Sequence, residues 1–474
     1  MARLNKDVML LILEELQNDN KTLYSCLLIN RTWCKAVTPI LWKNPNRQDI
    51  NERVFFNVIL SHLSEESRNN LMNQGVKLIA QPYQQTLFNY IRFWKYLDLC
   101  FLDRIMHDFF KYPESKIYIV GNEILNLFNM NTKFISIAIH KLSHIYITGT
   151  EHCFSEISEL EYFFCDIEIN SNVLERLAMI NSSIKKLRFE INNITKNSGI
   201  IRLIETQKNL KEVIVNSNNL FSNEFYCKSL EESLINCADT IQYLKIDWIP
   251  TTNYLSYLVN LVSLKIQGAR NANWLYLENV FLPHLKILKA RYIPSRILAN
   301  LIVNTKGKLI EIRILFQHSK DNEKLIQAIY RNCPNLNYLQ LSLNDINIAE
   351  FEKILIHCRF LIGLEIMESN GFYPYNKHDW SKFMKILVNS SSTNLFKFKF
   401  FTMNVENMIE ALELFLDGWK DRCPIRLKTI PLKYESYQLQ QLKDLLQMYK
   451  VKGIIKNYSV NSSIDEIECI QLIN

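Results

Sequence analysis

Residues 309–341, LIEIRILFQHSKDNEKLIQAIYRNCPNLNYLQL, begin and end with the same short pattern. It consists of an apolar residue, two variable residues, an apolar residue, one variable residue and a third apolar residue, as LIEIRI at 309–314 and LNYLQL at 336–341. Residues 322–332, between the copies, have apolar side chains at helical spacing. A short strand alternates its faces, so the second and third apolar residues point inward and the residue between them points outward. The stretch therefore predicts a strand, a helix packed behind it, and a second strand.

This pattern recurs through most of the chain, at spacings of roughly 20 to 34 residues. The clear copies begin at Ile184, Leu210, Ile241, Leu261, Leu285, Leu309, Leu336, Leu361 and Leu395, and the weaker copies begin at Trp94, Phe134, Leu160 and Leu427. One strand–helix unit cannot bury its own apolar face, so many units must stack. The sequence predicts an α/β fold in which parallel strands line the concave side of a curved, elongated solenoid and helices cover the convex side. Residues 436–450 predict a last helix, and residues 461–474 a terminal cap.

Four cysteines stand just before predicted strands. They are Cys237, Cys333, Cys358 and Cys423. A small apolar thiol fits a tight corner between a helix and the next strand.

Residues 4–42 have a different character and predict a small helical module. Apolar residues recur at helical spacing on both sides of a polar break at residues 18–20, where Asp19 or Asn20 can cap the second helix. Pro39 is compatible with the first turn of a third short helix but not with its interior. Three short helices bury little surface, so this module needs a partner or the rest of the chain against its apolar faces.

The module resembles the F-box. In the first half of the family pattern, Leu-Pro-x-Glu-Ile-Leu-x-x-Ile-Leu-x-x-Leu, the matching residues are Leu4, Asp7, Val8, Met9, Ile12, Leu13 and Leu16. The second half reads Leu28-Ile29-Asn30-Arg31-Thr32-Trp33 and ends with Leu41-Trp42. Asn5 stands where the family usually has Pro, which leaves the start of the first helix less stiff.

The resemblance implies that this module docks on the Skp-type linker subunit of a cullin–RING ligase. The residues carried over to that contact are Leu4, Asn5, Val8, Leu11, Ile12, Leu16, Leu28, Trp33 and Leu41. Some of them, Trp33 above all, are equally expected in the core of the module itself.

The repeats resemble the cysteine-containing leucine-rich repeats that often follow an F-box. The whole organisation is similar to the F-box/leucine-rich-repeat proteins of some fungi. We therefore expect an F-box at residues 1–45, a helical bridge at 46–92, and a leucine-rich-repeat solenoid with its cap at 93–474.

Composition limits the class of protein. The chain has 474 residues, of which 48% are hydrophobic and 22% charged, as in a folded protein that is too long for one compact core. The formal net charge of +7 is modest, and no Lys/Arg block indicates nucleic-acid binding. No stretch is apolar enough for a membrane span, and none has the order of a secretory signal. We expect an intracellular protein, cytoplasmic or nuclear, whose 11 cysteines are reduced thiols.

No catalytic motif is visible: the chain lacks GxGxxG, P-loop, HExxH and GxSxG patterns. His140, His144, His152 and Cys153 come nearest to a metal constellation, but the apolar alternation around the first two indicates a strand, on which they would not share a face. We expect no metal, no cofactor and no enzymatic activity of the chain itself.

Two functions follow from these observations. In the first, the chain is the substrate-recognition adaptor of an SCF-type ubiquitin ligase, which holds a target protein near the ubiquitin-conjugating enzyme and acts by proximity. In the second, the F-box is degenerate, as the departure at Asn5 allows, and the repeats form a non-catalytic scaffold without a role in ubiquitylation.

The repeat register also predicts a positive stripe on the concave face. The residues between the second and third apolar positions are mostly basic, and those proposed to bind a target are Arg188, Lys245, Lys265, Lys289, Arg313 and Lys399. Such a stripe would favour an acidic or phosphorylated segment of a target protein. In the alternative, these side chains only solubilise exposed strand positions, and the neighbouring Glu190, Glu212, Asp247 and Glu311 partly neutralise them.

Overall fold

A computed structural model describes residues 5–47, 51–76, 86–110, 113–139, 159–165, 169–191, 197–217, 224–269, 272–315, 322–343, 347–368, 379–402, 405–431 and 434–460. The chain forms two compact units, which are taken separately below. The first comprises Met1–Asn219 and Glu232–Ile241, and the second comprises Leu220–Glu231 and Gln242–Asn474. Helix α11 (Glu224–Ile235) is divided between them.

The first unit begins with three short helices, α1 (Lys6–Glu15), α2 (Asn20–Leu27) and α3 (Arg31–Leu41). A polar side chain caps the start of each. The Oδ1 atom of Asn5 accepts the Asp7 N–H at 3.2 Å, and Asp19 accepts the Thr22 N–H at 3.2 Å. Asn30 accepts the N–H groups of Thr32 and Trp33 at 2.9 and 3.1 Å. These caps satisfy donors that a helix leaves without intrahelical partners, and they fix where each helix begins.

The three helices share a small core. It consists of Met9, Leu13, Leu23, Cys26, Val37 and Leu41. Leu16, Leu27, Trp33, Ala36, Ile40 and Trp42 pack against it while remaining partly exposed. The module thus has a core of its own, although a small one.

Pro39 corrects one expectation. It lies inside α3, near the end of the helix, and not in the first turn of a separate helix. Its missing N–H costs one intrahelical hydrogen bond, the one to the carbonyl four residues earlier. Val37 and Leu41, both buried on the same helix, offset that loss through packing.

The predicted bridge consists of helices and an aromatic stack. The elements are η1 (Pro45–Arg47), α4 (Glu52–Ser61), α5 (Glu65–Asn73) and η2 (Ile91–Phe93). The ring of Trp42 stacks on Phe55 at 5.1 Å between centroids, Phe55 contacts Trp94 at 5.3 Å, and Trp94 contacts Phe128 at 4.9 Å. This row of rings joins the three-helix module to the strand–helix repeats within the first unit.

The repeats of the first unit place five parallel strands in chain order. These are β1 (Tyr96–Asp98), β2 (Ser136–Ile139), β3 (Tyr162–Cys165), β4 (Lys186–Ile191) and β5 (Glu212–Ser217). The helices between them are α6 (Leu99–Phe109), α7 (Glu114–Asn131), α9 (Ser171–Ile180) and α10 (Ser198–Glu205).

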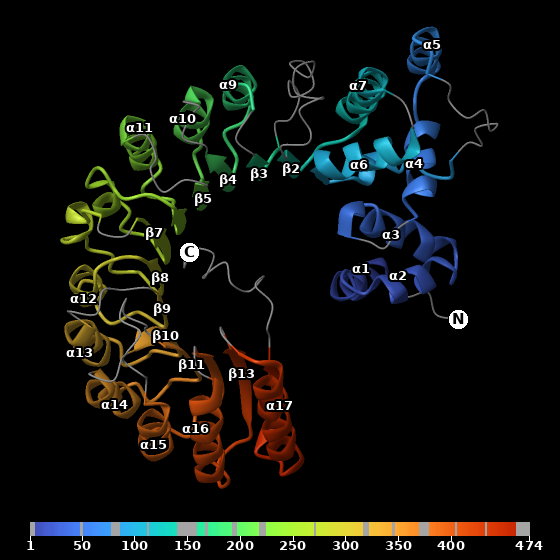
Figure 1. The fold of residues 1–474 in the computed structure, drawn as a ribbon. Helices are drawn as coiled ribbons and strands as arrows, with labels where there is room; N and C mark the ends of the chain where they lie inside the picture. The colour runs from blue at the N-terminus through green and yellow to red at the C-terminus, as the bar shows by residue number, and fades with distance from the viewer. Residues whose placement is uncertain are drawn as a thin grey trace. The chain divides into compact units, whose positions relative to one another are not determined.

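The second unit continues the same alternation with nine described strands, again parallel and in chain order. They are β6 (Tyr243–Ile246), β7 (Ser263–Gln267), β8 (Ile287–Arg291), β9 (Glu311–Leu315), β10 (Tyr338–Leu343), β11 (Gly363–Glu368), β12 (Lys397–Thr402), β13 (Ile425–Pro431) and β14 (Ile455–Val460). The intervening elements are η5 (Tyr254–Tyr257), η6 (Leu275–Leu277), α12 (Ser295–Val303), α13 (Asn322–Asn332), α14 (Ile348–His357), α15 (Trp380–Ser390), α16 (Val405–Gly418) and α17 (Ser436–Val451). In Figure 1, α12 to α16 lie on one side of these strands.

The apolar pattern is buried as predicted. Leu309, Ile312 and Ile314 have no exposed surface, and the other clear copies of the pattern are equally buried. A leucine-rich-repeat solenoid explains this, because each strand covers its apolar residues with its own helix and with the neighbouring repeats.

The predicted corner role of the cysteines holds for three of the four. Cys237, Cys333 and Cys358 are buried, and the thiol of Cys237 donates to the Ile204 carbonyl at 3.3 Å. Cys423 is exposed. It precedes β13, whose register differs from the predicted one, as described next.

The last repeat corrects the predicted register. Leu427 lies opposite Phe398, which is the second apolar residue of the repeat that begins at Leu395. Leu427 is therefore the second apolar residue of the last repeat, and not the first as predicted. Ile425, Leu427 and Thr429 alternate inward, whereas the sequence reading used Leu427 and Ile430 as its markers. The strand β14 was not predicted, and the proposed cap at residues 461–474 lies outside the described residues.

Candidate functional site

The three-helix module presents an apolar surface that its own core does not use. Val8, Leu11 and Ile12 on α1 are 43%, 63% and 38% exposed, and Leu28 after α2 is 89% exposed. Leu10, Tyr24 and Ile29 extend the same set of exposed apolar side chains. Val8, Leu11 and Ile12 share one face of α1 by helical spacing, and an exposed apolar face on a small module is typical of a protein–protein contact.

An apolar groove of about 510 Å³ lies beside this surface, within the first unit. Leu28 and Tyr24 form part of its wall, and Val54, Phe55 and Tyr90 come from the predicted bridge. Exposed Leu28 therefore belongs both to the apolar surface and to the groove. The groove can take apolar side chains of a partner, and its position extends the candidate surface from residues 8–29 into the bridge.

The residues predicted to contact the linker fall into two groups. Val8, Leu11, Ile12 and Leu28 are exposed, whereas Leu41 is buried in the core of the module. Leu16 and Trp33 pack against that core, Asn5 caps α1, and Leu4 lies outside the described residues. The structure thus leaves the exposed group as the surface on which a partner can act directly.

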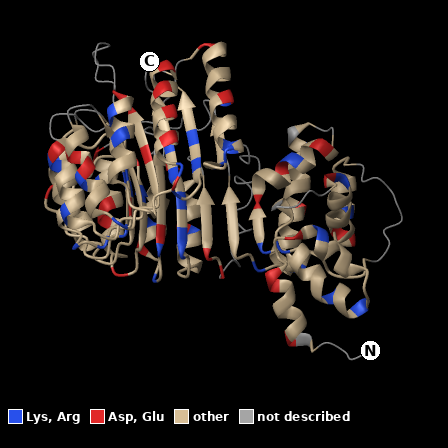
Figure 2. Cartoon of the chain, turned by 90° about the horizontal axis from the view of Figure 1, so that it is seen from below, with Lys and Arg blue, Asp and Glu red and all other residues tan. Residues whose placement is uncertain are grey.

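The predicted basic stripe lies in one register within the second unit. In the backbone register, Lys245 lies opposite Lys265 on the next strand, Lys265 opposite Lys289, and Lys289 opposite Arg313. The row continues through Gln340 and Glu365 to Lys399 and Lys428. Basic residues, coloured blue, recur along neighbouring strands in Figure 2. Arg188 occupies the equivalent strand position in the first unit, where it is exposed and stacks over Phe164 at 4.9 Å.

Carboxylates neutralise much of this row. Lys245 pairs with Asp247 at 3.5 Å, and Lys289 and Arg313 share Glu311, at 3.3 and 2.6 Å. For the middle part of the stripe, these ion pairs favour the alternative in which the basic side chains only solubilise exposed strand positions. Sequence reasoning named Asp247 and Glu311 as neutralisers, and both are partly buried next to the cations.

Glu365 is the centre of a buried polar network on the same face. Its side chain is 2% exposed and accepts the Tyr338 hydroxyl at 2.8 Å and the Gln340 amide at 2.7 Å. Lys399 lies 3.1 Å and Arg313 lies 3.9 Å from its carboxylate oxygens. Burial, together with the negative charge of Glu365, raises the pKa of Tyr338 well above its ordinary value. The tyrosine therefore remains a neutral hydroxyl donor at physiological pH.

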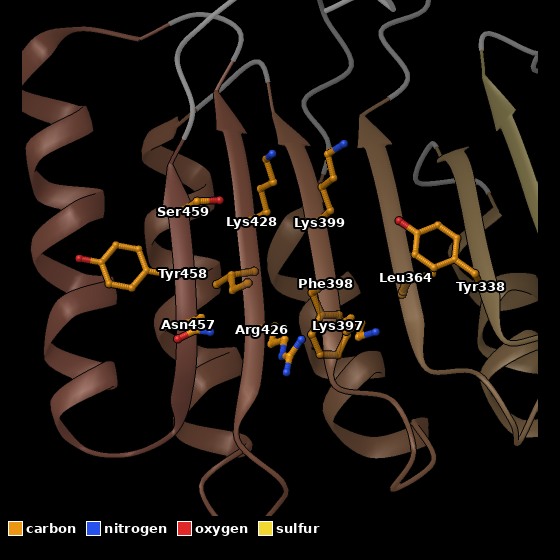
Figure 3. A pocket seen from close by; sticks show the side chains of 11 residues that line it. Tyr338, Leu364, Lys397, Phe398, Lys399, Arg426, Lys428, Asn457, Tyr458 and Ser459 are labelled. Carbon is orange, nitrogen blue, oxygen red and sulfur yellow. The ribbon is translucent and has the colours of Figure 1, made fainter. Parts of the chain in front are cut away.

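A pocket of about 380 Å³ on β10 to β14 was missed by sequence reasoning, except for Lys399. It gathers Lys397 and Lys399 from β12 and Arg426 and Lys428 from β13, as Figure 3 shows. The signal that could have found it is the period-two alternation Ile425, Leu427, Thr429, which sets Arg426 and Lys428 on the outward face.

In the described part of the chain, no helix is both long and apolar enough to cross a membrane. The metal candidates His140, His144, His152 and Cys153 lie outside that part.

No family model and no curated protein matches the chain. Solved structures that are similar to it in part include the following two. One is described as a Rad7 and Elc1 complex in yeast, with 14% identity, a TM-score of 0.39, and coverage of 73% of this chain and 88% of that one. The other is the leucine-rich-repeat-containing protein LegL7 from Legionella pneumophila, with 13% identity, a TM-score of 0.34, and coverage of 62% and 88%. At TM-scores this low, neither structure supports an inference about the function of this chain. The description as a leucine-rich-repeat fold rests on the strand–helix repeats of the chain itself.

Proposed function

We propose that this chain is the non-catalytic substrate-recognition subunit of an SCF-type cullin–RING ubiquitin ligase. Its F-box, within residues 1–45, binds the Skp-type linker subunit, and its repeats hold a target protein. The chain acts by proximity: it raises the effective concentration of the ubiquitin-conjugating enzyme at a lysine of the target. It contributes binding surfaces and no catalytic group.

The observation that carries this proposal is the exposure of apolar residues at F-box positions. Val8, Ile12 and Leu28 occupy places in the F-box pattern, yet they do not enter the core of the module. Exposed apolar side chains beside an apolar groove are costly in water unless a partner covers them. A linker subunit that buries this surface explains the exposure.

Asn5 does not weaken the proposal. Its backbone φ of −59° is one that proline also adopts, and its side chain caps α1. The chain therefore defines the start of α1 with a side-chain cap, where the family uses a proline ring.

The experiment is direct binding between the purified full chain and a purified Skp-type linker, measured by isothermal titration. We expect binding by the wild type and at least about tenfold weaker binding by the Leu11→Ser/Leu28→Ser variant, because each large apolar side chain contributes about 1.5–3 kcal/mol when it is buried. Met130→Ser/Met179→Ser is the matched control, because these two side chains are 85% and 80% exposed elsewhere in the first unit. A folded wild type that does not bind the linker would favour the scaffold function.

A further inference from the structure

Two neighbouring strands of the second unit place four cations around one hollow. Lys397 and Lys399 lie on β12, and their register partners on β13 are Arg426 and Lys428. Side chains two residues apart on a strand point to the same face. Adjacent strands are about 4.8 Å apart, and alternate residues are about 6.6 Å apart, so the four Cα atoms mark a rectangle of about 5 by 7 Å.

The hollow lies on the outward face of these strands. Leu364, Phe398 and Leu427 alternate with the cations, so their side chains are buried on the opposite face and their backbone forms the base of the hollow. Tyr338 stands at one end of it, and Glu365 accepts its hydroxyl (Figure 3). No carboxylate is among the eleven lining residues.

The charge balance of this pocket differs from that of the rest of the row. Among the described residues, no carboxylate pairs with Lys397 or Arg426, and both side chains are exposed. Lys399 contacts Glu365, but Arg313 shares that carboxylate. Positive charge is therefore in excess here, whereas Lys245, Lys289 and Arg313 each lie against a carboxylate.

We propose that this pocket binds a phosphorylated side chain in an extended segment of the target protein. The inference rests on the proposed function, in which the repeats hold the target. A phosphoryl group carries close to two negative charges and three acceptor oxygens, which suits four cations grouped on two neighbouring strands better than a single carboxylate does. Arg426 can donate two parallel hydrogen bonds to it, and the lysines contribute point charges. The ring of Tyr338 can contact a residue that flanks the phosphorylated position.

The surroundings favour a protein segment over a nucleic acid. A nucleic-acid chain carries a phosphate at every step and needs a continuous basic track. The row beside the pocket instead carries Gln340 and Glu365, and then cations already neutralised by Glu311. Those carboxylates would repel a second and a third phosphate. One group of cations bounded by carboxylates fits one modified side chain.

The test uses the full chain and three degenerate peptide libraries that are identical except at a fixed central residue: phosphoserine, serine or glutamate. Random flanking positions remove the need to know the target sequence. We expect the wild type to retain the phosphoserine library at least about tenfold better than the serine library, and the retention to fall with added salt. The Lys397→Glu/Arg426→Glu variant should retain the phosphoserine library no better than the serine library.

The control is Lys382→Glu/Lys443→Glu, which changes the net charge equally at two exposed helix positions of the second unit and should bind as the wild type does. A milder pair, Lys397→Gln/Arg426→Gln, separates loss of the site from loss of the fold. Unchanged retention by either folded pocket variant would overturn the proposal, as would equal retention of the glutamate library. If the wild type retained a random single-stranded DNA 10-mer better than the phosphoserine library, and the pocket variants did not, the ligand would be a nucleic acid and the proposal would be overturned. The linker takes no part in this assay, so its failure would leave the proposed function standing.

Discussion

Lys428 lies opposite Lys399 in the parallel register of β12 and β13. Lys397 and Arg426, the preceding register pair on the same face of these two strands, are exposed and have no carboxylate partner among the described residues, so positive charge is locally in excess. Exposed charges on a surface usually contribute little to stability. Here the pairing also lines a pocket, so the same residue types have two different roles on one face of the second unit.

Removing the charge of Glu365 should strengthen binding of the phosphoserine library. Glu365→Gln keeps the size of the side chain but releases Lys399, which now lies 3.1 Å from the carboxylate. We expect about three- to tenfold tighter retention, together with a loss of about 1–3 kcal/mol in the free energy of unfolding, because buried donors lose a charged acceptor. Fluorescence anisotropy and urea denaturation measure the two effects. Glu410→Gln, at an exposed position of α16, is the control, and unchanged retention by folded Glu365→Gln would count against the pocket.

Stability of the second unit should decline in acid through Glu311. Burial opposes ionisation of this residue, but the hydrogen bond and charge of Arg313 and the charge of Lys289 outweigh it, so the pKa of Glu311 lies below its ordinary value of 4.5. A lowered pKa in the folded state means that its contribution is complete above about pH 4.5 and is lost as the pH falls through the folded value. Urea midpoints measured between pH 7 and pH 3 should fall less steeply in Glu311→Gln. Parallel pH profiles for the variant and the wild type would refute this role.

The small core of the three-helix module predicts a sharp contrast between two leucines of one helix. Leu13 has no exposed surface, whereas Leu11 is 63% exposed. Leu13→Ala should lower the opening free energy of the α1–α3 amides by about 2–5 kcal/mol, and Leu11→Ala should change it little. Hydrogen exchange followed by mass spectrometry resolves this segment. Equal losses in both variants would mean that the exposed group supports the module rather than a partner.

The buried cysteines predict an order of thiol reactivity. Burial raises the pKa of Cys358 to about 12 and, with the charge of Glu205, that of Cys237 to about 11. Both thiols should resist iodoacetamide at pH 8 in the native state, because the thiolate is the reacting species. Among the cysteines that the structure describes, exposed Cys423 should be alkylated first. Peptide mapping after timed alkylation gives the order, and early labelling of Cys358 would contradict the packed corners of the repeats.

The sequence alone sufficed for the repeat architecture because each clear copy buries the same positions, as Leu309, Ile312 and Ile314 do. It failed at the last repeat, where Ile430 and Thr429 are both buried and the apolar pattern no longer marks a unique register. That one shift hid Arg426 and Lys428. Pro39 was misplaced because the rule against proline inside a helix states a cost, and the sequence does not show that the buried Val37 and Leu41 of the same helix offset it.

The candidate surfaces depended on facts that composition and spacing do not contain. The sequence shows that Leu41 and Leu28 are both apolar, but only packing shows that one is in the core and the other is 89% exposed. Likewise, the sequence offered both a binding stripe and its neutralisation by Asp247 and Glu311, and only the side-chain distances decide between them for the middle of the row.

The central claim is that the N-terminal apolar surface joins this chain to a ubiquitin ligase. The most direct measurement is quantitative mass spectrometry of proteins that co-purify from cells with the wild type, with Leu11→Ser/Leu28→Ser, and with the Met130→Ser/Met179→Ser control. The account predicts that the wild type and the control bring down the Skp-type linker and a cullin in near-equal amounts. The Leu11→Ser/Leu28→Ser variant should lose both and retain the proteins bound to the repeats. Absence of linker and cullin from the wild type, or their undiminished presence with that variant, would contradict it.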